Sequence, residues 1–164
     1  MCSDIRAIGL YTGSLRHLAL RVKDGKRSAI ERAADILASN LPVGAMVIPM
    51  PSHEGRATTM LEVARAIVRR RGDMVVVDAL ECVPHGGNYN AKKRGHSLPT
   101  ISMSCRLCSH GDIVLLRKSL GKAYIIDNCV DTGATFAAAS RAIPGVRLLA
   151  LASTHFPETS QSAV

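Results

Sequence analysis

Residues 124–135 read YIIDNCVDTGAT, and this stretch decides the fold class. An apolar run ends at the carboxylate of Asp127, a turn of small residues follows at 131–135, and a helical pattern comes next. A short apolar run of this kind is typical of a buried parallel strand, and the turn carries the chain from that strand into a helix. The stretch therefore predicts an α/β protein.

The turn at 131–135 also indicates a ligand. It offers consecutive backbone N–H groups and the hydroxyls of Thr132 and Thr135 at a helix N-terminus, which suits a phosphate monoester without any lysine. Asp127 would repel that phosphate, so we expect it to serve hydroxyl groups or a metal nearby. A ligand with a phosphate at one end and a diol at the other, such as a 5-phosphorylated ribose, fits both expectations.

Hydrophobic periodicity extends the alternation of strands and helices on both sides of this stretch. The pattern predicts helices over 28–37, 58–70 and 135–143, and strands over 45–48, 74–77, 123–127 and 146–152. Residues 113–116 fit either a strand or a short helix. We expect a parallel sheet covered by helices on both faces, with its binding site at the carboxyl ends of the strands. The segments that fall there are 49–56, 127–135 and 153–156.

Composition limits the class of protein. The chain has 164 residues, which suits one domain, over 1–158, with a short tail at 159–164. No run approaches 18 apolar residues and the first residues do not resemble a signal peptide, so we expect a cytoplasmic protein without a membrane span. The five cysteines, an odd number, indicate a reducing compartment. Cys105 and Cys108 form a C-x-x-C pair, for which zinc, a redox pair and ordinary thiols all stay open.

The charge indicates an anionic partner. A formal net charge of +8 suits either nucleic acid or a phosphorylated small molecule. Only 3% of the residues are aromatic, a poor platform for stacking successive bases, so composition favours the small molecule. The long polar stretch from 84 to about 104 is either disordered or functional. It holds Tyr89 and a basic group, Lys92, Lys93 and Arg94, followed by His96.

The stretch 124–135 resembles the signature of type I phosphoribosyltransferases, which bind 5-phosphoribosyl 1-pyrophosphate (PRPP). The resemblance implies that Asp127 and Asn128 hold the ribose hydroxyls and that the 5-phosphate lies in the turn formed by Asp131, Thr132, Gly133, Ala134 and Thr135. Asp131 stands where the family places an acidic group beneath the reacting sugar or base, so Asp127 and Asp131 are the catalytic candidates. Asn128 departs from the family, which has a second acidic residue there.

Two further segments are similar to the ComF-like (competence protein F-like) branch of this family. They are 10–23, with Tyr11-Thr12-Gly13-Ser14-Leu15-Arg16, and the P-x-P loop after the apolar strand at 47–51. The branch's amino-terminal zinc module and its Arg-Gly-Phe-Asn-Gln element are missing, and residues 52–56 replace the latter. The resemblance implies that pyrophosphate is bound by Pro51, Ser52, His53 and Arg56, with Lys92, Lys93 and Arg94 on a mobile hood loop. Tyr89 and Phe156 are candidates for stacking on an acceptor.

The resemblance implies a single-domain transferase of nucleotide metabolism that moves phosphoribose from PRPP to a nitrogen acceptor and releases pyrophosphate. Mg²⁺ would arrive with PRPP. The alternative is a non-catalytic PRPP- or nucleotide-sensing protein, or a DNA-uptake accessory of the ComF type, and Asn128 is the residue that keeps it open. Binding to nucleic acid is not favoured, a homodimer stays open, and the acceptor is not indicated.

Overall fold

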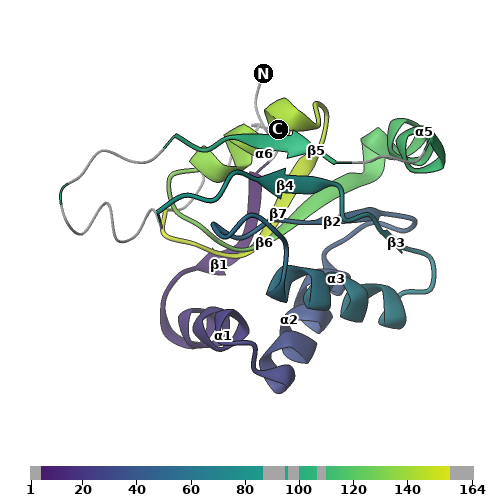
Figure 1. The fold of residues 1–164 in the computed structure, drawn as a ribbon. Coiled ribbons are helices and arrows are strands. Elements are labelled where there is room, and N and C mark those ends of the chain that lie inside the picture. Colours follow the sequence, from purple (N-terminus) through teal and green to yellow (C-terminus); the bar gives the residue numbers. More distant parts are fainter. Residues whose placement is uncertain (1–4, 87–94, 96–99, 107–109, 156–164) are drawn as a thin grey trace, which may run out of the picture.

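A parallel sheet of five strands forms the centre of the molecule (Figure 1). The structure is a computed structural model that describes residues 5–86, 95, 100–106 and 110–155. Across the sheet the strands lie in the order β1 (Ile5–Leu10), β7 (Arg147–Ser153), β6 (Ala123–Val130), β2 (Met46–Pro49) and β3 (Val75–Val76). Every neighbouring pair is parallel, as the alternation of strands and helices predicts.

The central strands are apolar on both faces because both faces are covered. In β6, Ile125 and Ile126 point to opposite sides of the sheet, and both are fully buried. Ile48 of β2 lies opposite Ile125, and Ala150 of β7 lies opposite Asp127. This register places Asp127 where β2 has already ended, at the carboxyl edge of the sheet.

Three helices cover one face of the sheet, seen together in the lower half of Figure 1. They are α1 (Gly13–Lys23), α2 (Arg27–Ser39) and α3 (Thr59–Arg70). Their apolar stripes pack on Val47, Ile126 and Leu149 of the sheet in one core cluster. Arg70 of α3 also forms ion pairs with Glu31 and Asp35 of α2, which joins the two helices at the surface.

The other face carries mixed elements (Figure 1). Helix α6 (Ala134–Ala142) packs Phe136 and Ala139 in the second core cluster. An antiparallel pair, β4 (Leu80–Cys82) and β5 (Met103–Cys105), lies beside it, and Leu80 belongs to the same cluster. The remaining elements of this part are α5 (His110–Ser119) and a 3₁₀ turn (Leu120–Lys122).

The predicted helices over 28–37, 58–70 and 135–143 and the predicted strands are confirmed to within a few residues. Residues 113–116, open between strand and helix, belong to helix α5. Strand β6 continues three residues past Asp127, to Val130, and residues from 103 form β5 at the end of the polar stretch. Strand β1 and the β4–β5 pair carried no clear periodic signal. No described helix is long and apolar enough to cross a membrane.

Candidate functional site

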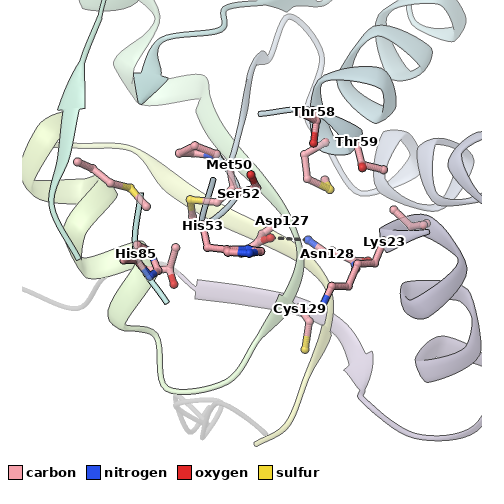
Figure 2. A pocket seen from close by; sticks show the side chains of 15 residues that line it. Lys23, Met50, Ser52, His53, Thr58, Thr59, His85, Asp127, Asn128 and Cys129 are labelled. Carbon is pink, nitrogen blue, oxygen red and sulfur yellow. Dashed lines mark hydrogen bonds between the residues drawn. The ribbon is translucent and has the colours of Figure 1, made fainter. Parts of the chain in front are cut away.

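The carboxyl edge of the sheet holds a cleft of about 390 Å³ (Figure 2). Six segments line it: the end of α1, the loop after β2, the start of α3, the β4–β5 region, the end of β6 and the start of α6. Its polar lining residues are Lys23, Ser52, His53, Thr58, Thr59, His85, Asp127, Asn128, Cys129 and Thr135. The prediction that the segments after β2 and β6 meet is thereby confirmed.

A second hollow, of about 780 Å³, adjoins the cleft on the side of β1 and β7. The two share Lys23, Asp127, Asn128, Cys129 and Thr135, so β6 and the end of α1 border both. The residues that line only the second hollow include Tyr11 and Arg16, the turn from Val130 to Gly133, and Thr154 and His155 after β7. The third predicted segment, 153–156, thus joins this edge through its described residues.

Asp127 stands between the two hollows, and its carboxyl group is mostly removed from water. Burial raises its pKa to about 7, against the opposing effect of the backbone N–H groups of Asn128 and Cys129. The Asn128 N–H donates to Oδ1 at 2.7 Å, the dashed contact in Figure 2. Near neutral pH this carboxyl therefore changes between a form that donates a hydrogen bond and one that only accepts.

Asn128 is turned toward the helical layer. Its side-chain Nδ2 donates to the Ala19 carbonyl of α1 at 2.8 Å, and its buried Oδ1 has no hydrogen-bond partner among the described residues. The amide nitrogen is therefore committed to holding α1 against β6. Although Asn128 borders both hollows, one of the two N–H donors of its side-chain amide is already engaged with Ala19.

The turn after β6 is shaped by Gly133, which has a φ of 76° and caps α6. A left-handed conformation of this kind favours glycine because it has no Cβ. Within the turn, the Ala134 N–H donates to Thr132 Oγ1 at 3.3 Å. Asp131 accepts a hydrogen bond from Thr154 Oγ1 at 2.7 Å, and His155 Nε2 lies 3.9 Å from the same carboxylate oxygen. Contacts to the segment after β7 thus orient the Asp131 carboxylate.

The loop after β2 is a tight turn over residues 52–56. The Ser52 N–H donates to the Arg56 carbonyl at 3.0 Å, and Gly55 has a φ of 113°. A Cβ on Gly55 would lie 3.0 Å from the Cys82 carbonyl oxygen, so the close approach of this loop to β4 requires glycine. Pro51, Ser52 and His53 line the cleft, at the carboxyl edge where the segment 49–56 was expected.

The predicted role of Arg56 finds no support in the geometry. Its guanidinium lies 3.9 Å from Glu81 of β4, both side chains are well exposed, and Arg56 lines neither the cleft nor the second hollow. The other predicted residues of the hood loop and the acceptor site, Tyr89, Lys92, Lys93, Arg94, His96 and Phe156, lie outside the described residues.

Several lining residues were not predicted from the sequence, and three of them have side chains of chemical interest. Lys23 ends α1 and borders both hollows, His85 follows β4, and Cys129 lies on β6. Lys23 stands in the segment that resembles the ComF-like branch, which is a usable signal. His85 and Cys129 carried none, because their positions depend on how β4 and β6 pack against the rest of the cleft.

The thiol of Cys129 stays protonated at neutral pH and is therefore a poor nucleophile. Burial, with smaller contributions from the charges of Asp127 and Asp131, raises its pKa to about 11. Of the C-x-x-C pair, Cys105 is exposed, while Cys108 lies outside the described residues.

Metal ligands are sparse in the described part of the chain, which contains no group of three or more His, Cys, Asp or Glu side chains able to hold a metal ion. Asp127, with one oxygen engaged by a backbone N–H, could contribute at most part of a coordination shell. Such a donor set fits Mg²⁺, which keeps several waters and binds substrate phosphates together with one or two carboxylates.

No protein-family model matches the chain, and a search of curated protein sequences finds no match. The geometry of the two hollows and the residues that line them therefore carry the functional argument.

Proposed function

We propose that the chain is a phosphoribosyltransferase with a type I fold, which binds Mg-PRPP and transfers phosphoribose to a nitrogen acceptor. The observation that carries the proposal is the position of Asp127 between two adjoining hollows, one lined by the P-x-P loop and the other by the turn after β6. A ligand with a diol in its middle and phosphates at both ends matches this order of groups.

The second hollow suits the 5-phosphate. The turn from Asp131 to Gly133 leads into the N-terminus of α6, where backbone N–H groups and the helix dipole favour an anion. Arg16 and Lys23 reach the same hollow from α1 and add positive charge. The carboxylates of Asp131 and Asp127 would repel a phosphate there, although one oxygen of Asp131 accepts a hydrogen bond from Thr154.

The cleft suits the pyrophosphate. Ser52, with Thr58 and Thr59 at the start of α3, supplies hydroxyl donors, while His53 and Lys23 supply groups that can carry positive charge. Pyrophosphate would leave with the electron pair of the C1–O bond, and the lone pair of the acceptor nitrogen would form the new bond to C1. That nitrogen then loses a proton. Mg²⁺ bound to the substrate would neutralise charge on the leaving group.

Asp127 and Asp131 would act on the sugar while C1 becomes cationic. An ionised Asp127 accepts hydrogen bonds from the ribose hydroxyls and stabilises that positive charge. Asp131 is oriented by Thr154 and borders the hollow that adjoins the sugar, where it could also accept the proton of the acceptor nitrogen.

One observation favours the non-catalytic alternative, a protein that binds PRPP or a nucleotide as a sensor or as a ComF-type accessory. Asn128 is neutral and its amide nitrogen donates to Ala19, so Asp127 has no second carboxylate at the next position to share the diol. A site with one carboxylate stabilises a cationic sugar less than a site with two. Binding would then survive while turnover falls.

Calorimetry with Mg-PRPP, followed by pyrophosphate release over a panel of nucleobases and amines, tests both. Binding with release supports the enzyme, and binding without release supports the sensor. In Asp127→Ala we expect PRPP binding to be lost, whereas His17→Asn, a change on an exposed part of α1 that lines neither hollow, should bind normally. Absence of PRPP binding by the unmodified protein would refute both versions.

A further inference from the structure

Two histidines, His53 and His85, face the cleft from separate segments (Figure 2). His53 lies in the loop after β2, and His85 follows β4. Their ring centroids are 6.5 Å apart and their planes are tilted by 60°. The backbone N–H of His85 donates to the backbone carbonyl of His53 at 3.1 Å, and this bond fixes the spacing of the two residues.

The protonation of one ring can be inferred from its contact. His85 Nδ1 lies 2.8 Å from the Gly86 carbonyl oxygen, which can only accept a hydrogen bond. Nδ1 therefore carries hydrogen, and in the neutral ring Nε2 is unprotonated. Such a ring can donate from Nε2 to an anion only after it gains a proton and becomes an imidazolium.

The spacing suits an oxygen between the rings. Centroids 6.5 Å apart leave the ring nitrogens too distant for a direct hydrogen bond. Two N–H···O bonds of about 2.8 Å that meet on one oxygen span this separation, whereas two Zn–N bonds of about 2.0–2.1 Å at a tetrahedral angle would bring the rings closer together. A phosphoryl oxygen is therefore a better match than a metal ion.

We propose that His53 and His85 together bind the pyrophosphate of the ligand as imidazolium groups, so that binding takes up protons. This inference rests on the proposed function and adds His85 and a proton linkage to it. In the described part of the chain, the charged and titratable groups that face the pair are Lys23 from α1 and Asp127 and Cys129 from β6, with Arg56 and Glu81 paired outside the cleft. Among the described groups of the cleft, only Lys23 carries a fixed positive charge, and protonated imidazoles would add to it.

The test is calorimetry with inorganic pyrophosphate, PRPP and ribose 5-phosphate from about pH 5.5 to 8, in buffers of different ionisation enthalpy. Proton uptake appears as a dependence of the measured heat on the buffer. The variants are His53→Asn, His85→Asn and His85→Gln, each checked for folding by circular dichroism. His17→Asn repeats the same chemical change outside the cleft and reports the titration of the ligand itself.

We expect the unmodified protein and His17→Asn to bind pyrophosphate with proton uptake and more tightly at low pH. Loss of either cleft histidine should weaken pyrophosphate and PRPP at least about tenfold at low pH, the size of a hydrogen bond to a charged group, and leave ribose 5-phosphate unchanged. The variant Asp127→Asn removes the carboxyl group of the cleft that also titrates in this pH range, so its contribution to proton uptake can be told from that of the histidines. A proton uptake that persists in this variant supports the histidines, and one that vanishes overturns the inference.

Pyrophosphate binding in the His85 variants with unchanged affinity and unchanged proton uptake would also overturn it. In that case continued binding of PRPP and ribose 5-phosphate would leave the proposed function standing. If the unmodified protein binds neither PRPP nor ribose 5-phosphate, the proposed function fails and the inference fails with it.

Discussion

Replacing Asn128 by aspartate would restore the acidic pair typical of the family that this segment resembles, and the structure predicts that the change is costly. The amide nitrogen of Asn128 donates to the Ala19 carbonyl at 2.8 Å, and this bond joins β6 to α1. An ionised aspartate has no hydrogen to donate. It would place a carboxylate oxygen against that carbonyl and beside the carboxyl group of Asp127.

The magnitude follows from that lost contact. A buried acceptor left without its donor costs about 1–3 kcal/mol, and a charged neighbour adds to this. We expect the free energy of unfolding of Asn128→Asp to fall by about 2–3 kcal/mol at pH 8. For a domain of this size each kcal/mol corresponds to about 2–4 °C in Tm, so the midpoint should fall by about 4–12 °C.

The loss should depend on pH with a defined sign. Burial beside a carbonyl disfavours the charged form, so the pKa of the new carboxyl would be raised in the folded state. The penalty is then small at acidic pH, where the protonated group can donate to Ala19. It grows as the pH rises above the value at which the unfolded chain ionises.

Urea or thermal unfolding at about pH 5 and pH 8 measures the effect, and Asn40→Asp is the matched control. Asn40 also donates its amide nitrogen to a helical carbonyl, that of Ile36 at 2.9 Å, but at the end of α2 where water can replace it. For Asn40→Asp we expect the free energy of unfolding to fall by about 1 kcal/mol or less. Equal losses for the two variants, or an Asn128→Asp protein as stable as the parent at pH 8, would refute the reasoning.

Three other predictions follow from the same region. The pKa of Asp127 is raised to about 7 from an ordinary value near 3.8, so between these pH values the folded protein binds more protons than the unfolded chain. The free energy of unfolding should therefore fall as the pH rises through this window, by an amount of the order of 2–4 kcal/mol. Asp127→Asn should remove that slope in urea unfolding followed from pH 4.5 to 7.5. Gly55→Ala should lower the free energy of unfolding by about 1–3 kcal/mol and weaken pyrophosphate binding, because the new Cβ would lie 3.0 Å from a β4 carbonyl oxygen. A pyrophosphate affinity equal to that of the parent in calorimetry would contradict this. At pH 7.5 iodoacetamide should modify exposed Cys105 well before half-buried Cys129, whose pKa is near 11, as peptide mass spectrometry would show.

Local patterns were enough to predict most of the framework. The apolar runs at 45–48 and 148–152 are buried on both faces, which is why they stand out as continuous hydrophobic segments. The helices at 28–37 and 58–70 are amphipathic because one side packs on the sheet. Strand β1 lies at the sheet edge and is only partly buried, and the short β4–β5 pair has exposed positions, so neither presents a clear period.

The candidate site was predictable only in part, for a related reason. The turn after β6 and the P-x-P loop are each one short continuous stretch of sequence. Because binding sites of parallel sheets lie at the carboxyl ends of the strands, the two could be placed together without knowledge of the packing. The positions of Lys23 and His85 depend on contacts between distant segments, such as the backbone bond from His85 to His53. Arg56 was assigned to pyrophosphate because it follows the P-x-P loop, yet its guanidinium lies 3.9 Å from Glu81 and lines neither hollow.

The sequence by itself determined the parallel α/β architecture and pointed to the end of β6 as the candidate site. Burial on both faces leaves a continuous apolar run, and a strand end followed by a small-residue turn leaves a local pattern. Only the tertiary structure decided what the side chains there can do. Whether Asn128 faces a ligand or donates to Ala19, and whether Asp127 is charged, depends on the helix that packs against β6 and on the water it excludes.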